Sequence, residues 1–250
     1  MLWLIMLNHY ASSFKGQKVL VVGGSSGIGL AVAETCALQG AEVVIASSSL
    51  ARVEAACRVL PTGVRGEVLD VTSVNKIAEA FERIGDIDHL VFTAGDHLVL
   101  DPLNTLDLEA ARRAFEVRYW GALNTAKIAN QYLRRTGSIT FSSGIGSQRP
   151  MPGWSVTASI LGALEALTRS LAVELAPLRV NAVSSGVLRT PLWSNMDGAE
   201  RESLFAQVAE KLPVGRVGEA SDSAKAYIYL MQQAYGTGQV IIADGGHVLV

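Results

Sequence analysis

The sequence predicts a single α/β domain with a doubly wound parallel sheet and helices on both of its faces. Short apolar runs rich in β-branched residues alternate with segments of helical period along the chain, which is the pattern of successive β-α units. The runs are apolar almost throughout, as strands buried on both faces of a parallel sheet must be. We expect strands at 18–22, 42–46, 66–69, 89–93, 138–142, 179–184 and 239–243, and helices at 29–39, 51–59, 74–84, 108–133, 155–176, 199–211 and 221–233.

The composition is that of a globular protein. Of the 250 residues 49% are apolar and 18% are charged, which excludes extensive disorder. A formal charge of −2 excludes the basic surface of a nucleic-acid-binding protein. Cys36 and Cys57 have no metal-ligand spacing, so we expect reduced thiols and no metal site.

Residues 1–14 are expected to form an N-terminal extension, and residues 15–250 the domain. The apolar run at 2–7 has no preceding basic segment and is too short to span a bilayer. We therefore expect a soluble, cytoplasmic protein with no membrane partner. Met6 is an alternative start to Met1.

A glycine-rich turn follows the first expected strand and opens the first expected helix. Gly23 allows the tight turn, Gly27 leaves room for a pyrophosphate, and Gly29 permits close packing of helix on strand. The helix N-terminus then offers free N–H groups and the positive end of its dipole to phosphate. The other residues expected to line this phosphate site are Ser25, Ser26 and Ile28.

The end of the second expected strand indicates which dinucleotide is bound. A site for NAD carries an acid near this point, for the ribose 2′-hydroxyl, but no acid occurs between Glu42 and Glu54. The hydroxyl side chains and the cation found there instead are those of Ser47, Ser48, Ser49 and Arg52. They suit a 2′-phosphate, so NADP is favoured over NAD. Alternatively, the serines cap the next helix.

With these motifs the chain resembles the short-chain dehydrogenase/reductase family along essentially its full length. The resemblance implies a Rossmann-type fold, a lid over the substrate around 191–212, and a homo-oligomer, most often a tetramer. It also implies further cofactor contacts after the later strands, at Asp70, Val71, Ala94, Gly95, Gly186 and Thr190.

The resemblance breaks down at the catalytic residues. The family uses a Tyr, a Lys four residues later, a Ser thirteen residues before the Tyr, and an Asn on the preceding helix. Ser143 is retained, and counting from it places Val156 at the Tyr position and Ile160 at the Lys position. Arg118 stands at the Asn position. Two hydrocarbon side chains cannot supply the proton that an alkoxide needs after hydride transfer.

Three side chains are candidates for the missing chemistry. Arg118 can stabilise an oxyanion, or it forms a structural salt bridge. His97, oriented by Asp96, can move a proton, or it is an exposed loop residue. Ser143, with Ser142, can donate a hydrogen bond to a carbonyl, or its hydroxyl is satisfied by the backbone.

Large apolar residues in two segments point to an apolar or aromatic small-molecule substrate. They are Met151, Trp154, Trp193 and Met196, and they line a cleft or serve in packing. The first functional hypothesis is an NADP(H)-dependent oxidoreductase with a non-standard active site. The second is an NADP-binding protein without dehydrogenase activity, a sensor or an inactive partner subunit. A third is a non-redox enzyme that reuses the cleft.

Overall fold

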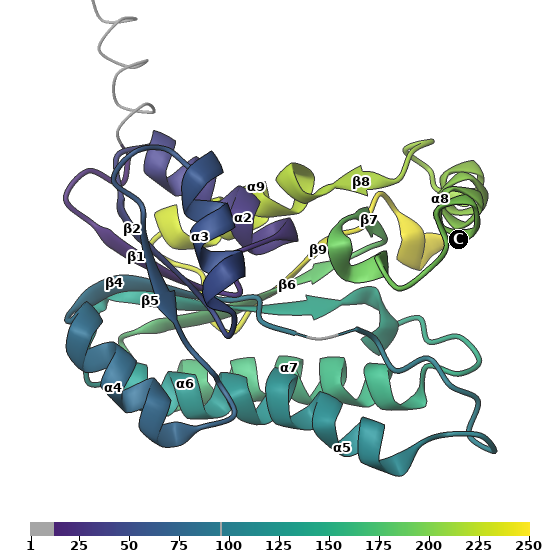
Figure 1. The fold of residues 1–250 in the computed structure, drawn as a ribbon, viewed down its shortest axis with the longest axis horizontal. Helices are drawn as coiled ribbons and strands as arrows, with labels where there is room; N and C mark the ends of the chain where they lie inside the picture. The colour runs from purple at the N-terminus through teal and green to yellow at the C-terminus, as the bar shows by residue number, and fades with distance from the viewer. Residues whose placement is uncertain (1–12, 96) are drawn as a thin grey trace, which may run out of the picture.

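Seven parallel strands form the central sheet, as the sequence predicts (Figure 1). The structure is a computed structural model that describes residues 13–95 and 97–250. In spatial order the strands are β3 (Arg65–Val68), β2 (Glu42–Ser47), β1 (Lys18–Val22), β4 (Ile87–Phe92), β5 (Leu133–Gly144), β6 (Arg179–Ser185) and β9 (Val240–Ala243). A separate pair joins β7 (Leu188–Arg189) to β8 (Gly218–Glu219).

The helices cover both faces of this sheet (Figure 1). One face carries α2 (Gly27–Leu38), α3 (Leu50–Val59) and α9 (Ala220–Gln232). The other carries α4 (Val74–Ile84), α5 (Leu108–Phe115), α6 (Gly121–Ala129) and α7 (Ser155–Glu174). Helix α8 (Gly198–Lys211) lies beyond the sheet, near β7 and β8. Short helical turns are the π turn η1 (Glu116–Trp120) and the 3₁₀ turns η2 (Ile145–Ser147), η3 (Pro191–Trp193) and η4 (His247–Leu249).

The hydrophobic core has a layer on each side of the sheet. Every residue of β4 and β6 is buried, the polar ones included, as expected of central strands covered on both faces. Phe81 of α4 and Leu164 of α7 pack in one layer, and Cys36 of α2 and Tyr227 of α9 in the other. A smaller cluster under α8 includes Phe205.

The longest apolar helix behaves as a core helix. By length and mean hydropathy alone, α7 is long and apolar enough to cross a membrane, the one such helix in the described part of the chain. Half of its most apolar window is buried within the fold, so packing accounts for its composition.

Two expectations from the sequence are wrong. The helix expected at 108–133 is interrupted by η1 and ends at Ala129, and Leu133 already pairs with Ile87 of β4. The spacing of apolar residues in this segment fits either a helix or a strand, and the pairing with β4 makes Leu133 part of a strand. Phe14, assigned to the extension, is 1% exposed and belongs to the core of the domain. The expected extension otherwise lies outside the described residues.

The strand order places a crevice beside the ends of β1 and β4. The chain builds outward from β1 through β2 to β3, and then returns to the other side of β1 with β4. Helices on the two sides of this switch point diverge, and ligands of such sheets bind there, at the carboxyl ends of the strands.

At the opposite end of β4, a histidine is buried in the core. His89 Nδ1 lies 2.8 Å from Ser138 Oγ, and its Nε2 lies 3.1 Å from Gln17 Oε1. The Phe14 ring meets the imidazole edge to face. Burial lowers the pKa of His89 to about 4; the Arg179 charge adds to this effect and the Asp88 charge opposes it.

We predict that this histidine makes the fold sensitive to acid. Because its folded-state pKa lies below its unfolded value near 6.5, the stabilisation is complete above pH 6.5 and is lost as the pH falls toward 4. The shift corresponds to about 3 kcal/mol of unfolding free energy. Chemical denaturation of wild type and His89→Gln at several pH values measures it. The variant should lose less stability over this range, and an equal loss in both proteins would contradict the assignment.

Candidate functional site

The glycine-rich turn brings α2 into contact with the ends of β1 and β4. A Cβ at Gly23 would lie 2.5 Å from the Ala94 nitrogen, and one at Gly29 would collide with the Gly23 carbonyl oxygen and with Thr93 Oγ1. Thr93 Oγ1 donates to the Val22 carbonyl at 3.1 Å, which ties the two strand ends together. Only glycine permits this approach.

The N-terminus of α2 is open toward the crevice. Within α2, whose residues are all described, the first turn has no acid, and the N-cap Ser26 makes no side-chain capping bond. The N–H groups of this turn and the positive end of the helix dipole are therefore available to an anion. A Cβ at Gly27 would meet nothing closer than 3.5 Å, so this glycine keeps space clear. These residues fit the pyrophosphate of a dinucleotide.

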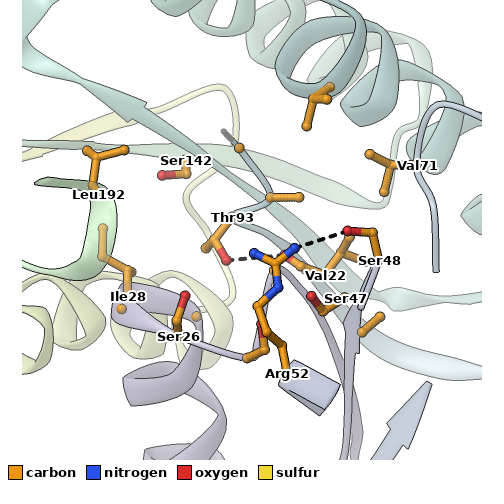
Figure 2. Close-up of a pocket in the computed structure, with 18 of the residues that line it drawn as sticks. Val22, Ser26, Ile28, Ser47, Ser48, Arg52, Val71, Thr93, Ser142 and Leu192 are labelled. Carbon is orange, nitrogen blue, oxygen red and sulfur yellow. Dashed lines mark hydrogen bonds between the residues drawn. The ribbon is translucent and has the colours of Figure 1, made fainter. Parts of the chain in front are cut away.

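A groove of about 550 Å³ runs from this turn along the strand ends (Figure 2). Most of the residues that the sequence predicts for the cofactor line it, namely Gly23, Ser25, Ser26, Gly27, Ile28, Gly29, Ser47, Ser48, Arg52, Asp70, Val71, Ala94, Gly95 and Thr190. Residues that the prediction missed include Leu69, Thr72, Thr93, Val117 and Leu192. Three of them follow strand ends, whereas Val117 lies in η1 and Leu192 in η3, so the tertiary arrangement rather than local sequence identifies them.

Arg52 and Ser48 form one end of the groove. The Arg52 guanidinium donates to Ser48 Oγ at 3.3 Å, and Figure 2 shows it extending along the groove. Ser49 is the exception among the predicted serines, because it caps α3 by accepting from the Arg52 N–H and does not line the groove. Ser49 thus takes the capping role of the second alternative, whereas Ser47 and Ser48 line the groove.

Asp70 is held as a carboxylate at the side of the groove. Its Oδ1 accepts from the Thr72 N–H at 3.1 Å and the Thr72 hydroxyl at 2.6 Å, and its Oδ2 lies 3.3 Å from Lys76 Nζ. The bonds from Thr72, with a smaller effect of the Lys76 charge, lower the pKa of Asp70. The side chain orders the loop after β3.

Arg118 lies where the groove meets a second, inner cavity of about 110 Å³, and it lines both. It sits in the middle of the π turn η1, a type of turn that is common at functional sites. A Cβ at Gly95 would lie 2.5 Å from the Arg118 guanidinium carbon. Because Gly95 has no side chain, the Arg118 guanidinium can lie against the backbone that follows β4.

The inner cavity has mainly apolar walls. Trp154, Leu161 and Trp193 border it, and Trp193 Nε1 donates to the Leu188 carbonyl at 3.1 Å. Met151 is half exposed and Met196 packs under α8; neither lines either cavity. The two tryptophans are therefore the members of the predicted apolar set that a ligand would meet.

The residues of α7 that face this cavity differ from the expected ones. Val156 and Ile160 are 8% and 1% exposed and pack in the main core rather than along a cavity. Thr157 and Leu161, one residue later, line the inner cavity. Counting thirteen residues from Ser143 therefore leads to two residues that do not border this cavity. The Thr157 hydroxyl donates to the Val99 carbonyl at 2.9 Å.

Ser143 lines the inner cavity, but its proton is directed elsewhere. Its hydroxyl donates to Glu165 Oε1 at 2.9 Å, and the Ser147 hydroxyl donates to the same oxygen at 2.6 Å. The Ser143 hydroxyl is therefore satisfied by a side chain and not by the backbone, as the second alternative expected. Sequence reasoning missed Glu165; an acid on an otherwise apolar face of the helix was the available signal.

His97 lies at the rim of the groove, beneath the start of the expected lid. Its Nδ1 lies 3.2 Å from the Leu192 carbonyl oxygen and donates to it. The other ring nitrogen, Nε2, takes no part in this hydrogen bond. His97 is exposed and lines the groove, but not the inner cavity. Asp96, its expected partner, lies outside the described residues.

The segment at 191–212, expected to form a lid, begins beside the groove. Thr190, Pro191 and Leu192 line the groove, whereas Trp193 and Phe205 are buried in the cluster under α8. Gly186, after β6, lines the inner cavity rather than the groove. The lid segment therefore forms one wall shared by the two cavities.

Comparisons with known proteins agree with this architecture. A family model described as enoyl-(acyl carrier protein) reductase matches residues 22–247. Short-chain dehydrogenase/reductase ATR9 of Stachybotrys chlorohalonatus is 36% identical over 95% of this chain and 99% of its own. The structure of MalC reductase/Diels-Alderase from Malbranchea aurantiaca is 31% identical, with a TM-score of 0.88 and coverage of 96% and 100%. A small-chain dehydrogenase in complex with NADPH is 34% identical, with a TM-score of 0.80 and coverage of 94% and 99%.

Proposed function

Because the chain belongs to the short-chain dehydrogenase/reductase family, we propose that it is an NADP(H)-dependent oxidoreductase with a non-standard active site. One observation carries this proposal. The groove that begins at the open N-terminus of α2 continues past Arg118 into an apolar cavity. A dinucleotide in the groove would thus end beside a small organic molecule in the cavity.

The choice of NADP rests on the end of β2. Arg52 and Ser48 offer a guanidinium and a hydroxyl where an acid would repel a 2′-phosphate. The similar dehydrogenase solved with NADPH supports the same choice. NADP(H), when bound, supplies or accepts a hydride at its nicotinamide ring.

The protein's own side chains would bind and polarise the reacting group. Arg118 stays protonated at neutral pH, so it can hold a developing oxyanion but cannot deliver a proton. Trp154, Leu161 and Trp193 exclude water from the cavity and thereby strengthen this interaction. Unchanged turnover in Arg118→Ala would contradict this role.

The substrate class follows from the walls of the cavity. Tryptophan and leucine side chains fit an apolar or aromatic group that carries one polar, reducible bond. The family description refers to an enoyl reductase, so a conjugated C=C bond is a candidate beside a C=O bond. The relative named both reductase and Diels-Alderase supports a second candidate, bond formation in the cavity without redox chemistry. The alternative without dehydrogenase activity, a sensor or an inactive partner subunit, predicts nucleotide binding alone.

Two further properties belong to the same proposal. Small residues on α7, including Gly162 with open space beside it, offer a face for close helix contacts between subunits. We therefore propose a homo-oligomer, most simply a tetramer, in the cytoplasm; a monomer mass from light scattering would contradict the assembly.

We predict that Arg52 selects NADPH over NADH. Arg52→Ala removes a charge-assisted contact to the 2′-phosphate, which should weaken NADPH binding by roughly ten- to a hundredfold and leave NADH binding unchanged. Fluorescence titration with each nucleotide measures this. Arg58→Ala, an exposed arginine on the same helix, is the matched control. An equal loss for both nucleotides would refute the role of Arg52.

We also predict that the family's catalytic pair can be restored at Thr157 and Leu161. Because these residues face the inner cavity, Thr157→Tyr/Leu161→Lys would place a phenol and an ammonium there. The double variant should reduce cyclohexanone faster than wild type by about a hundredfold, as expected of an added proton donor. The rate of NADPH oxidation measures it.

Val156→Tyr/Ile160→Lys is the matched control. It puts the same groups into the packed core, where an unpaired charge and excess volume should destabilise the fold by about 3 kcal/mol or more. A folded, active control with an inactive first variant would show that the assigned helix face is wrong. Turnover by Thr157→Tyr/Leu161→Lys, with none by wild type for any ketone, quinone or enone, would favour the alternative of an NADP-binding protein without dehydrogenase activity.

A further inference from the structure

A buried carboxylate lies directly behind the inner cavity, and the proposed function does not use it. Glu165 is on α7, two turns after Thr157, and only 9% of its surface is exposed. Its Oε1 accepts hydrogen bonds from Ser143 at 2.9 Å and from Ser147 at 2.6 Å. We refer to Ser143, Ser147 and Glu165 as the Ser–Glu cluster.

Ser143 connects the cluster to the cavity. It lines the cavity wall, whereas Glu165 does not. Because Ser143 donates its hydrogen to Glu165, the lone pairs of its oxygen remain to accept a hydrogen bond from a group inside the cavity. A hydroxyl between a ligand and a carboxyl group is the arrangement through which a proton can pass in either direction.

The charged residue of the cavity wall does not supply a proton. Among the described residues that line the inner cavity, Arg118 is the charged one. A guanidinium polarises an oxygen but keeps its protons. The Ser–Glu cluster adds an ionisable group in contact with the cavity wall, and the carboxyl group of Glu165 can both take and give a proton.

We propose that Glu165, acting through Ser143, is the proton reservoir of the reaction. The inference rests on the proposed function, and it makes Glu165 a positioning and relay residue, because Ser143 is the member of the cluster that meets the substrate. In reduction, the carbonyl carbon gains the hydride supplied by NADPH as the C=O π bond breaks. The oxygen takes a proton from Ser143, and Ser143 takes the proton of the Glu165 carboxyl group. Glu165 is left as a carboxylate, and a proton from solvent returns it to its starting form.

In oxidation, each of these steps runs in reverse. The alcohol proton would pass to Ser143 and the Ser143 proton to Glu165, and bound NADP⁺ would supply the acceptor for the hydride. The observed bond, with Ser143 donating to Glu165, is the arrangement ready to accept an alcohol proton. Rotation of the serine hydroxyl gives the arrangement for reduction.

The first test is Glu165→Gln with cyclohexanone and NADPH. The amide oxygen still accepts both serine bonds, but the amide has no proton to give at neutral pH. We expect an unchanged melting temperature, an unchanged KM and a kcat lower by about a hundredfold. Ser143→Ala should lose as much, and the double variant no more than either single one. Glu174→Gln, an exposed acid on the same helix, is the control and should keep wild-type turnover.

A wild-type kcat in Glu165→Gln would overturn the relay and leave the proposed function standing. Losses that add in the double variant would also overturn it, because the two residues would then act separately. If the glutamine variant fails to fold, Ser143→Ala decides, since it removes only the hydroxyl. Undiminished turnover in that variant would refute the relay.

The second test needs neither NADPH nor turnover. Ligand-detected NMR compares binding of cyclohexanol with that of methoxycyclohexane, which lacks the donor. Wild type and Glu165→Gln should prefer the alcohol, and Ser143→Ala should not. Equal binding of both ligands to wild type would overturn the relay whatever the activity. Absence of cyclohexanone turnover in wild type would overturn the carbonyl reaction and the relay's part in it. A preference for the alcohol would still show that Ser143 accepts a hydrogen bond from a ligand in the cavity.

Discussion

The close approach of α2 to the ends of β1 and β4 is the constraint on which the site depends. Gly23, Gly29 and Thr93 meet there without space for another carbon atom, so the helix axis points into the crevice. That orientation leaves the first N–H groups of α2 facing the groove. The same packing fixes the end of β4, from which Gly95 gives Arg118 its place. A dense contact between backbones thus sets the positions of groups that are far apart in the sequence.

The sequence predicts those parts of the fold that local patterns determine. The expected bounds of α4 and β1 agree with the structure, because an amphipathic repeat and a buried apolar run are local features. Leu133 was misassigned because its spacing suits a helix, and only pairing with Ile87 makes it part of a strand. The residues of α7 that border the inner cavity could not be predicted from a count along the chain, because segments distant in the sequence form the other walls of that cavity.

The candidate site was predictable to a similar extent. Glycines and serines of the groove are recognisable because backbone geometry and phosphate chemistry restrict which residues can stand there. The Ser–Glu cluster is different, since Glu165 is separated from its serine partners by 18 and 22 residues along the chain. A buried acid shows in sequence only as an exception within an apolar helix. In the proposed reaction the chemistry is divided between a permanent cation, which would polarise the substrate, and hydroxyls backed by a carboxyl group, which would handle protons.

The π turn between α5 and α6 has a consequence for how such a site can change. A π turn holds one residue more than an α turn, so an insertion is absorbed locally while the helices on either side keep their docked faces. Arg118 occupies this turn, and Gly121 just after it stays packed against Val71. New side chains can therefore be presented to the cavity from this position without repacking the core. The turn is a natural place for diversification, in evolution as in design.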